Sequence, residues 1–233
     1  MKILGIDSSA DTVAVALLED RTVLASFCGN MKKTHSNTLL PTVDYVLSYS
    51  GLKPDDIDLY SVSVGPGSFT GIRIGVATVK GLAFGKDTPV CAVSTLEAMA
   101  YSFSDREGAY VCPVLNARRG DVYNALFKIV KGIPQRITDD TSTHATELEK
   151  SLERYENVFF CGDGVQVLNQ YFLKRTVNEQ NELISYPSGY GVALAGMNAY
   201  ASGNYTTGTE LAPVYLKPSQ AERERNEKLN QNK

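Results

Sequence analysis

The residues best suited to chemistry lie in three short turns that mix aspartate, serine, arginine and glycine. They are Asp7, Ser8, Ser9, Arg118, Arg119, Gly162, Asp163 and Gly164. A glycine turn before a helix can offer backbone amides to a phosphate, and arginines bind anions. These turns are therefore candidates for a nucleotide cleft. The structural alternative is that aspartate and serine bond nearby backbone amides, as they do in ordinary turns.

A glycine-rich segment follows a short predicted strand and a Gly-Pro turn. The predicted helix at residues 71–84 contains Gly71, Gly75 and Gly81, and each glycine costs about 1 kcal/mol relative to alanine inside a helix. Close approach of another helix or of a ligand would compensate for this cost. On a helical wheel the apolar residues Ile72, Val76, Val79 and Ala83 would cover a sheet. An adjoining stripe of small or apolar residues then needs a further packing partner.

The predicted helix at residues 36–50 also has two distinctive faces. One stripe is apolar and consists of Leu39, Leu40, Val43, Val46 and Leu47. The opposite stripe holds threonines and tyrosines with almost no charge, which is typical of an interface because tyrosine is enriched there. An exposed neutral face is the alternative. The predicted partner interface of the two helices is Thr38, Thr42, Tyr45, Tyr49, Gly71, Ile74, Gly75, Thr78, Gly81 and Leu82.

The order of the predicted elements repeats once along the chain. Strands at 2–8, 12–18 and 21–28 precede a helix, strand, helix, strand, helix series. After a polar break the pattern returns, with strands at 110–116, 121–130 and 133–138. Helices at 144–154, from 164 and at 189–201 alternate with strands at 157–161 and 182–186. Two βββαβαβα halves predict an α/β protein with the duplicated actin-like, or ribonuclease H-like, fold. We expect lobes at residues 1–105 and 106–217 and a polar tail at 218–233.

The composition is that of a soluble globular protein, with 43% hydrophobic and 21% charged residues. The sequence lacks a signal-peptide pattern and a membrane-spanning run, which predicts a cytoplasmic protein. A net charge of −3 offers no basic surface for binding nucleic acid alone. The four cysteines form no CxxC pair and are expected to be reduced thiols, mostly in the core.

Five motifs extend over almost the whole chain: GIDSS at 5–9, SVGPGSFTGIRIG at 63–75, LNARRGDVY at 115–123, CGDG at 161–164 and VYLKP at 214–218. With them the chain resembles the TsaB (YeaZ) family. This resemblance implies a role in making N6-threonylcarbamoyladenosine at position 37 of tRNAs that read codons beginning with A. It implies a non-catalytic subunit that pairs with TsaD and works with the ATPase TsaE, and that forms a homodimer alone. No intrinsic cofactor is implied. Nucleotide would bind only within the assembled complex, and contact with tRNA would be indirect.

Two enzymatic alternatives remain open from the sequence. In the actin-like fold Asp7 would lie where ATPases hold a magnesium-linked phosphate, so an ATPase or kinase could use Asp7 and the Gly162 turn. A metallopeptidase would need the histidine pair of TsaD, but the corresponding residues are Thr95 and Met99. Threonine is a weak ligand and methionine a soft one. We therefore expect no metal site.

Overall fold

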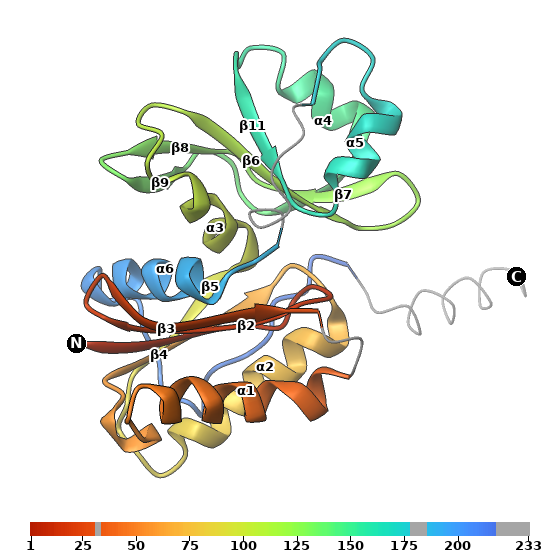
Figure 1. The fold of residues 1–233 in the computed structure, drawn as a ribbon. Helices are drawn as coiled ribbons and strands as arrows, with labels where there is room; N and C mark the ends of the chain where they lie inside the picture. Colours follow the sequence, from red (N-terminus) through yellow and green to blue (C-terminus); the bar gives the residue numbers. More distant parts are fainter. Residues whose placement is uncertain (31–33, 178–185, 218–233) are drawn as a thin grey trace, which may run out of the picture.

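The computed structural model describes residues 1–30, 34–177 and 186–217. The predicted tail at 218–233 lies outside these ranges, and so does the predicted strand at 182–186 apart from its last residue. Figure 1 shows two sheets, one above the other, with helices between them and on their outer faces.

The first sheet has the strand order β3-β2-β1-β4-β5. Its strands are β1 (Lys2–Asp7), β2 (Val13–Glu19), β3 (Thr22–Gly29), β4 (Leu59–Gly65) and β5 (Val90–Ser94). The first three strands are antiparallel neighbours, whereas β4 and β5 run parallel to β1. Along the chain, β3, β4 and β5 are each followed by a helix. This order of elements, together with the strand order of the sheet, confirms the actin-like unit predicted for the first half.

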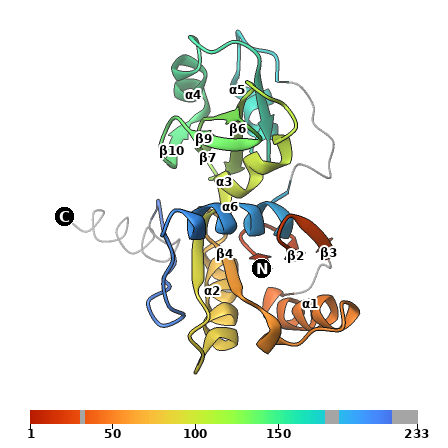
Figure 2. The same cartoon turned by 90° about the vertical axis from the view of Figure 1, so that its left-hand side faces the viewer.

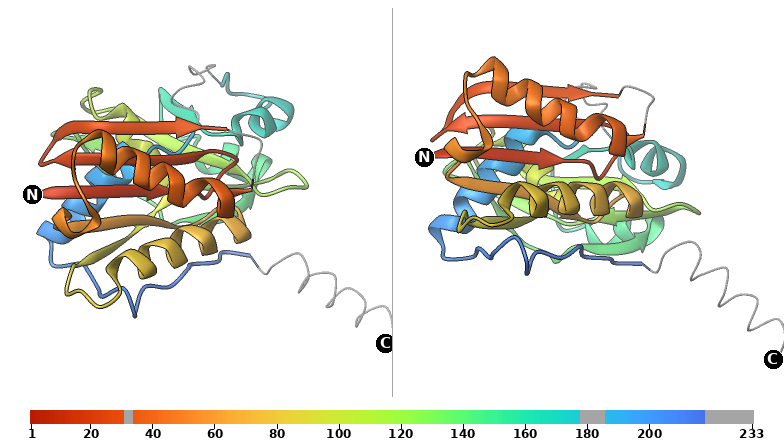
Figure 3. Two further views of the ribbon diagram at one scale, coloured as in Figure 1. Left: turned by 60° about the horizontal axis from the view of Figure 1, so that its bottom comes forward. Right: turned by 90° about the horizontal axis from the view of Figure 1, so that it is seen from below.

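Helices cover both faces of the first sheet. The helices α1 (His35–Tyr49) and α2 (Phe69–Ala83) lie side by side on one face (Figure 3). The opposite face is covered by α6 (Gly189–Ala201), which packs on β1, β2 and β4 and against α3 (Thr95–Ala100) (Figure 2). We expected α6 to close the second half. It packs on the first sheet instead. The predicted lobe boundary between residues 105 and 106 therefore assigns α6 to the second lobe, although α6 packs with the first sheet.

Close backbone contact explains why α6 can approach this sheet. A Cβ atom on Gly5 of β1 would overlap the Gly189 carbonyl oxygen, and one on Gly189 would crowd the backbone of Ala16. Ser61 of β4 donates a hydrogen bond to the Val192 carbonyl over 2.8 Å. The small residues at the start of α6 therefore place the helix directly on the strands.

The second sheet has the order β10-β7-β6-β8-β9, and β11 pairs with β6 in parallel. Its strands are β6 (Tyr110–Asn116), β7 (Asp121–Asn124), β8 (Phe127–Val130), β9 (Ile133–Arg136), β10 (Thr141–His144) and β11 (Val158–Cys161). The helices of this half are α4 (Ala145–Ser151) and α5 (Val165–Tyr171). Two short 3₁₀ helices, at Pro54–Asp56 and Tyr101–Phe103, lie earlier in the chain.

The strand predicted at 121–130 is broken in two, into β7 and β8. The strand predicted at 133–138 is present as the shorter β9, and β10 was not predicted. At the break, the Leu126 N–H donates to the Thr138 hydroxyl over 2.8 Å, and the Leu126 carbonyl accepts from the Ile137 N–H over 2.8 Å. These contacts replace regular ladder pairing at the break.

The cysteine prediction is confirmed. All four cysteines are free thiols, and Cys91, Cys112 and Cys161 are buried, while Cys28 is exposed. Burial raises the pKa of the Cys91 thiol to about 11 and that of Cys112 to about 12. None of the helices in the described ranges is long and apolar enough to cross a membrane.

Candidate functional site

A cavity of about 620 Å³ lies where elements of the two halves meet. It is lined by Ser9, Ala10, Asp11, Pro66, Gly67, Ser68, Phe69, Thr70, Ile72, Leu115, Asn116, Ala117, Arg118, Tyr123, Asp163, Val214, Tyr215, Leu216 and Lys217. Apart from Ala10 and Asp11, every one of these residues belongs to one of the five motifs described above. Segments far apart in the sequence therefore converge on one cavity.

Asp7 and Ser8 lie beneath this cavity and do not line it. Asp7 is fully buried, and its carboxylate accepts hydrogen bonds from the Ser9 backbone N–H over 2.9 Å and from the Ser9 hydroxyl. Burial raises the pKa of Asp7 above its ordinary value, against the hydrogen bonds that lower it. The Ser8 hydroxyl donates to the Gly71 carbonyl over 2.9 Å. Both side chains are used in holding the turn.

Two glycines of α2, Gly71 and Gly75, face this turn rather than a second molecule. A Cβ atom on Gly71 would overlap the Ser8 carbonyl oxygen, and one on Gly75 would lie about 2.5 Å from the Ser8 hydroxyl oxygen. Both glycines are buried. Gly81 differs, because it is exposed and has nothing within 4 Å of an added Cβ. The close approach predicted for this helix is therefore intramolecular at Gly71 and Gly75, which corrects their assignment to the partner interface.

The second candidate turn is a tight connection between β6 and β7. Arg118 and Arg119 have φ angles of 67° and 58°, and Gly120 follows at 81°. The Arg118 N–H donates to the Asn116 side-chain oxygen over 2.8 Å. Of the two predicted arginines, Arg118 lines the cavity and Arg119 is not among its lining residues.

The third candidate turn serves mainly to pack β11 on β6. Added Cβ atoms on Gly162 and Gly164 would both collide with the backbone of Val114. Asp163 does reach the cavity, and its carboxylate accepts a hydrogen bond from the Asn116 N–H over 2.9 Å. Burial raises the pKa of Asp163 above its ordinary value. Of the eight predicted cleft residues, Ser9, Arg118 and Asp163 line the cavity.

The segment Leu211–Lys217 closes one side of the cavity and joins the two halves. The Val214 N–H donates to the Val64 carbonyl on β4 over 2.8 Å. At its end, the Lys217 ammonium group lies 2.7 Å from an Asp121 carboxylate oxygen at the start of β7. In the sequence, VYLKP served only as a family motif and did not predict that this segment lines the cavity. Four cavity-lining residues of the motifs were also not identified as site residues from the sequence: Phe69, Tyr123, Tyr215 and Lys217.

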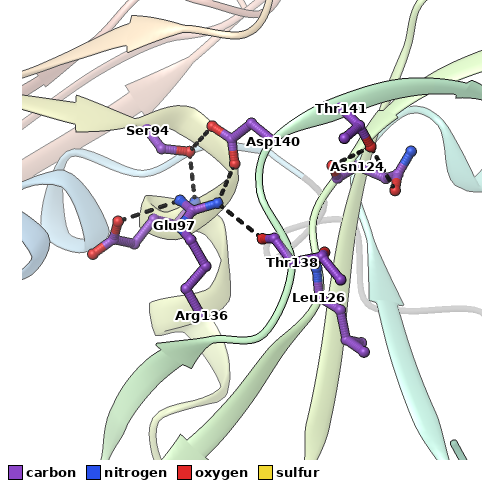
Figure 4. A network of polar contacts seen from close by, with 8 residues as sticks. All are labelled: Ser94, Glu97, Asn124, Leu126, Arg136, Thr138, Asp140 and Thr141. Carbon is purple, nitrogen blue, oxygen red and sulfur yellow. Dashed lines mark hydrogen bonds and ion pairs between the residues drawn. The ribbon is translucent and has the colours of Figure 1, made fainter.

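A second polar connection between the halves surrounds Arg136 (Figure 4). The Arg136 guanidinium pairs with Asp140 and, over 3.5 Å, with Glu97 of α3. The Ser94 hydroxyl donates to Asp140 over 2.6 Å and accepts from the Glu97 N–H over 3.2 Å, so Ser94 caps the N-terminus of α3. Burial raises the pKa of Glu97, Arg136 lowers it and Asp140 raises it.

We expect Arg136→Met to lower the free energy of unfolding by about 1–3 kcal/mol at pH 7.5, because it leaves two partly buried carboxylates without their cation. The loss should shrink towards pH 5, because burial holds the pKa of Glu97 above its ordinary value and removal of Arg136 raises this pKa further, so Glu97 takes up a proton. Urea unfolding at both pH values measures the effect. Lys174→Met, which removes the exposed pair with Glu153, is the control and should change little. A loss independent of pH would contradict this explanation.

The two helices on the outer face of the first sheet present the other predicted surface. Thr38 and Thr42 are each 5% exposed, so their assignment to the outward face is corrected. Their hydroxyls donate to the carbonyls four residues earlier in the chain. The tyrosines of the same stripe do face solvent, with Tyr45 60% and Tyr49 73% exposed. The threonines are covered because α1 lies next to α2 there.

We define the helix surface as a set of nine exposed or partly exposed uncharged residues, eight on α1 and α2 and one directly after α2. They are Leu40, Tyr45, Tyr49, Ile74, Ala77, Thr78, Gly81, Leu82 and, just after α2, Phe84. Phe84 is 82% exposed and Leu40 is 55% exposed. The charged residues of the two helices are Asp44 on α1 and Arg73 and Lys80 on α2. Such a concentration of exposed apolar and tyrosine side chains is typical of a protein interface.

The described residues contain no group of three or more His, Cys, Asp or Glu side chains placed to hold a metal ion. Thr95 and Met99, which correspond to the histidine pair of the catalytic relatives, are fully buried. His35 contacts the Ala10 carbonyl over 2.7 Å, and His144 caps α4. The two histidines therefore have structural partners on separate segments.

Comparison with known proteins agrees with this arrangement. The family model described as "TsaD: tRNA N6-adenosine threonylcarbamoyltransferase" matches residues 22–224. The tRNA threonylcarbamoyladenosine biosynthesis protein TsaB of Bacillus subtilis is 36% identical over 171 residues, which cover 73% of this chain and 74% of that protein. TsaB of Haemophilus influenzae is 27% identical over 232 residues and covers 93% and 94%. The solved structure of YeaZ from Pseudomonas aeruginosa superposes with a TM-score of 0.81 at 25% identity, covering 92% of this chain and 99% of that one. The chain therefore belongs to the TsaB family, within the wider group that the TsaD model describes.

Proposed function

We propose that this chain acts in the formation of N6-threonylcarbamoyladenosine in tRNA as a non-catalytic subunit that binds TsaD. The observation that carries the proposal is the helix surface, because its exposed tyrosines and apolar side chains have no cover within the described chain. A TsaD partner of similar fold could place two of its own helices against α1 and α2. TsaE would join as a third component, and the chain would form a homodimer through the same surface when TsaD is absent.

The geometry of the first turn supports a non-catalytic role. Asp7, the residue best placed in this fold to hold a magnesium-linked phosphate, is buried and bonded to Ser9. The Ser68 N–H donates to the Ser9 carbonyl over 2.7 Å, so the start of α2 covers the turn. We therefore place no phosphate chemistry on this chain alone. In our proposal it has no intrinsic cofactor, nucleotide binds only in the assembled complex, and tRNA is held by the complex in the cytoplasm.

We expect depletion of this protein in its own cell to remove N6-threonylcarbamoyladenosine from bulk tRNA, because the catalytic subunit loses its partner. Mass spectrometry of tRNA nucleosides measures the modification, and expression of the intact chain should restore it. Asp7→Asn should also restore it, since Asp7 has only a structural role in this proposal. An unchanged level after depletion would refute the proposed function. Rescue by wild type but failure of a well-folded Asp7→Asn variant would favour the ATPase alternative.

A further inference from the structure

Arg73 is an exposed arginine of α2 whose side chain is held in place by two aromatic rings. Its guanidinium carbon lies 4.0 Å from the centroid of the Phe69 ring and 5.7 Å from that of Tyr215. The two rings stack with centroids 4.5 Å apart. The Arg73 Nε donates a hydrogen bond to the Tyr215 hydroxyl over 2.8 Å. An arginine fixed in this way has little conformational freedom left to lose when it binds a ligand.

The rest of the Arg73 guanidinium remains available for a ligand. Within the described part of the chain, Nε makes the one hydrogen bond assigned to Arg73, and no ion pair there includes it. Arg136, by contrast, uses its Nη1 and Nη2 groups on Asp140 and Glu97. The free Nη1 and Nη2 groups of Arg73 form a planar fork that matches the two oxygens of a carboxylate or a phosphate.

The position of Arg73 favours a carboxylate of a protein partner. Ala77 and Gly81, four and eight residues further along α2, are exposed, and neighbouring Ile74 is partly exposed. A protein that docks on the helix surface would therefore pass next to Arg73. The residues of the helix surface carry no charge that could bind the phosphates of a nucleic acid, and the net charge of the chain is −3.

We propose that Arg73, positioned by Phe69 and Tyr215, receives a carboxylate side chain of the protein that docks on the helix surface. Tyr215 is a positioning residue in this arrangement, because its hydroxyl fixes the orientation of the guanidinium. The inference rests on the proposed function, since it takes TsaD as the docking partner. It adds that the partner presents an acidic residue at the Arg73 end of α2, which an apolar surface alone would not require.

The experiment measures the dissociation constant for purified TsaD of the same organism by calorimetry, at low and high salt. We expect Arg73→Gln to weaken binding about tenfold or more and to reduce its salt dependence. Arg73→Lys keeps the charge but loses the fork, and Tyr215→Phe keeps the ring but loses the hydroxyl, so both should give smaller losses. Arg106→Lys is the matched control, because Arg106 also stacks on a ring, with its guanidinium carbon 4.6 Å from the Phe159 centroid. It should bind as wild type does.

Tyr45→Ala separates this inference from the proposed function. If Tyr45→Ala weakens TsaD binding but Arg73→Gln binds as wild type does, the Arg73 inference is overturned and the helix surface stands. If neither variant changes the affinity, the helix surface itself is wrong. If Arg73→Gln leaves TsaD binding unchanged and instead weakens tRNA binding by the assembled pair, the fork receives a phosphate and the inference is again overturned.

Discussion

Gly71→Ala is expected to lower the free energy of unfolding by about 2–3 kcal/mol, although alanine is the better helix former. The added Cβ would overlap the Ser8 carbonyl oxygen, which is a backbone atom and cannot move aside without distorting the turn. The same turn is held by the bond from the Ser8 hydroxyl to the Gly71 carbonyl. A loss of this size is a large part of the total stability of an ordinary domain.

Gly81→Ala on the same helix is the matched control and should shift stability in the opposite direction. Gly81 is exposed and has nothing within 4 Å of an added Cβ, so the substitution gains helix propensity of up to about 1 kcal/mol. Urea unfolding followed by circular dichroism measures both variants. Equal shifts in the two variants would mean that the contact of Gly71 with the first turn does not limit how α2 packs.

The sequence predicted where α2 lies, but it could not say which glycine of α2 faces the protein interior. Apolar residues at helical spacing identify the buried stripe, and Ile72, Val76 and Val79 are indeed buried. The neighbouring stripe is ambiguous, because a glycine in it can face a strand turn or a second protein equally well. Only the position of Ser8, more than sixty residues earlier in the chain, decides between them.

Other differences from the sequence prediction have the same tertiary origin. The sequence predicts one strand over 121–130, but the strand breaks where the Leu126 N–H donates to the Thr138 hydroxyl. The apolar residues of α6 indicate a buried helix, but its own sequence does not indicate which of the two sheets the helix covers. Its place depends on the contact between Gly5 and Gly189.

The candidate cavity was predictable in its parts and not as a whole. Aspartate, serine, arginine and glycine in turns drew attention to three of the five segments that line it. Tyr215 gave no local signal, because its role depends on Phe69 and on Arg73, which is 142 residues away in sequence. The five sequence motifs together could have indicated that their residues meet in one cavity, since nearly all residues that line the cavity belong to these motifs.

Thr78→Arg is expected to weaken TsaD binding about a hundredfold or more while leaving the monomer folded. Thr78 is partly exposed on α2, and its hydroxyl donates to the Ile74 carbonyl of the same helix over 2.8 Å. A long arginine can extend into solvent in the free chain. In a close helix packing it must either separate the helices or bury a charge, and both are costly.

Ser151→Arg is the matched control for this prediction. Ser151 is an exposed hydroxyl residue at the end of α4, and it also bonds back to its own helix, at the Leu148 carbonyl over 2.8 Å. Calorimetry with TsaD and thermal unfolding should show that both variants fold and that only Thr78→Arg loses affinity, together with its ability to restore the tRNA modification in depleted cells. If Thr78→Arg bound TsaD as wild type does, the partner would have to dock elsewhere. The exposed tyrosines of α1 would then need another explanation, because Tyr45 and Tyr49 are assigned to the same helix surface as Thr78 and their rings are exposed and in contact.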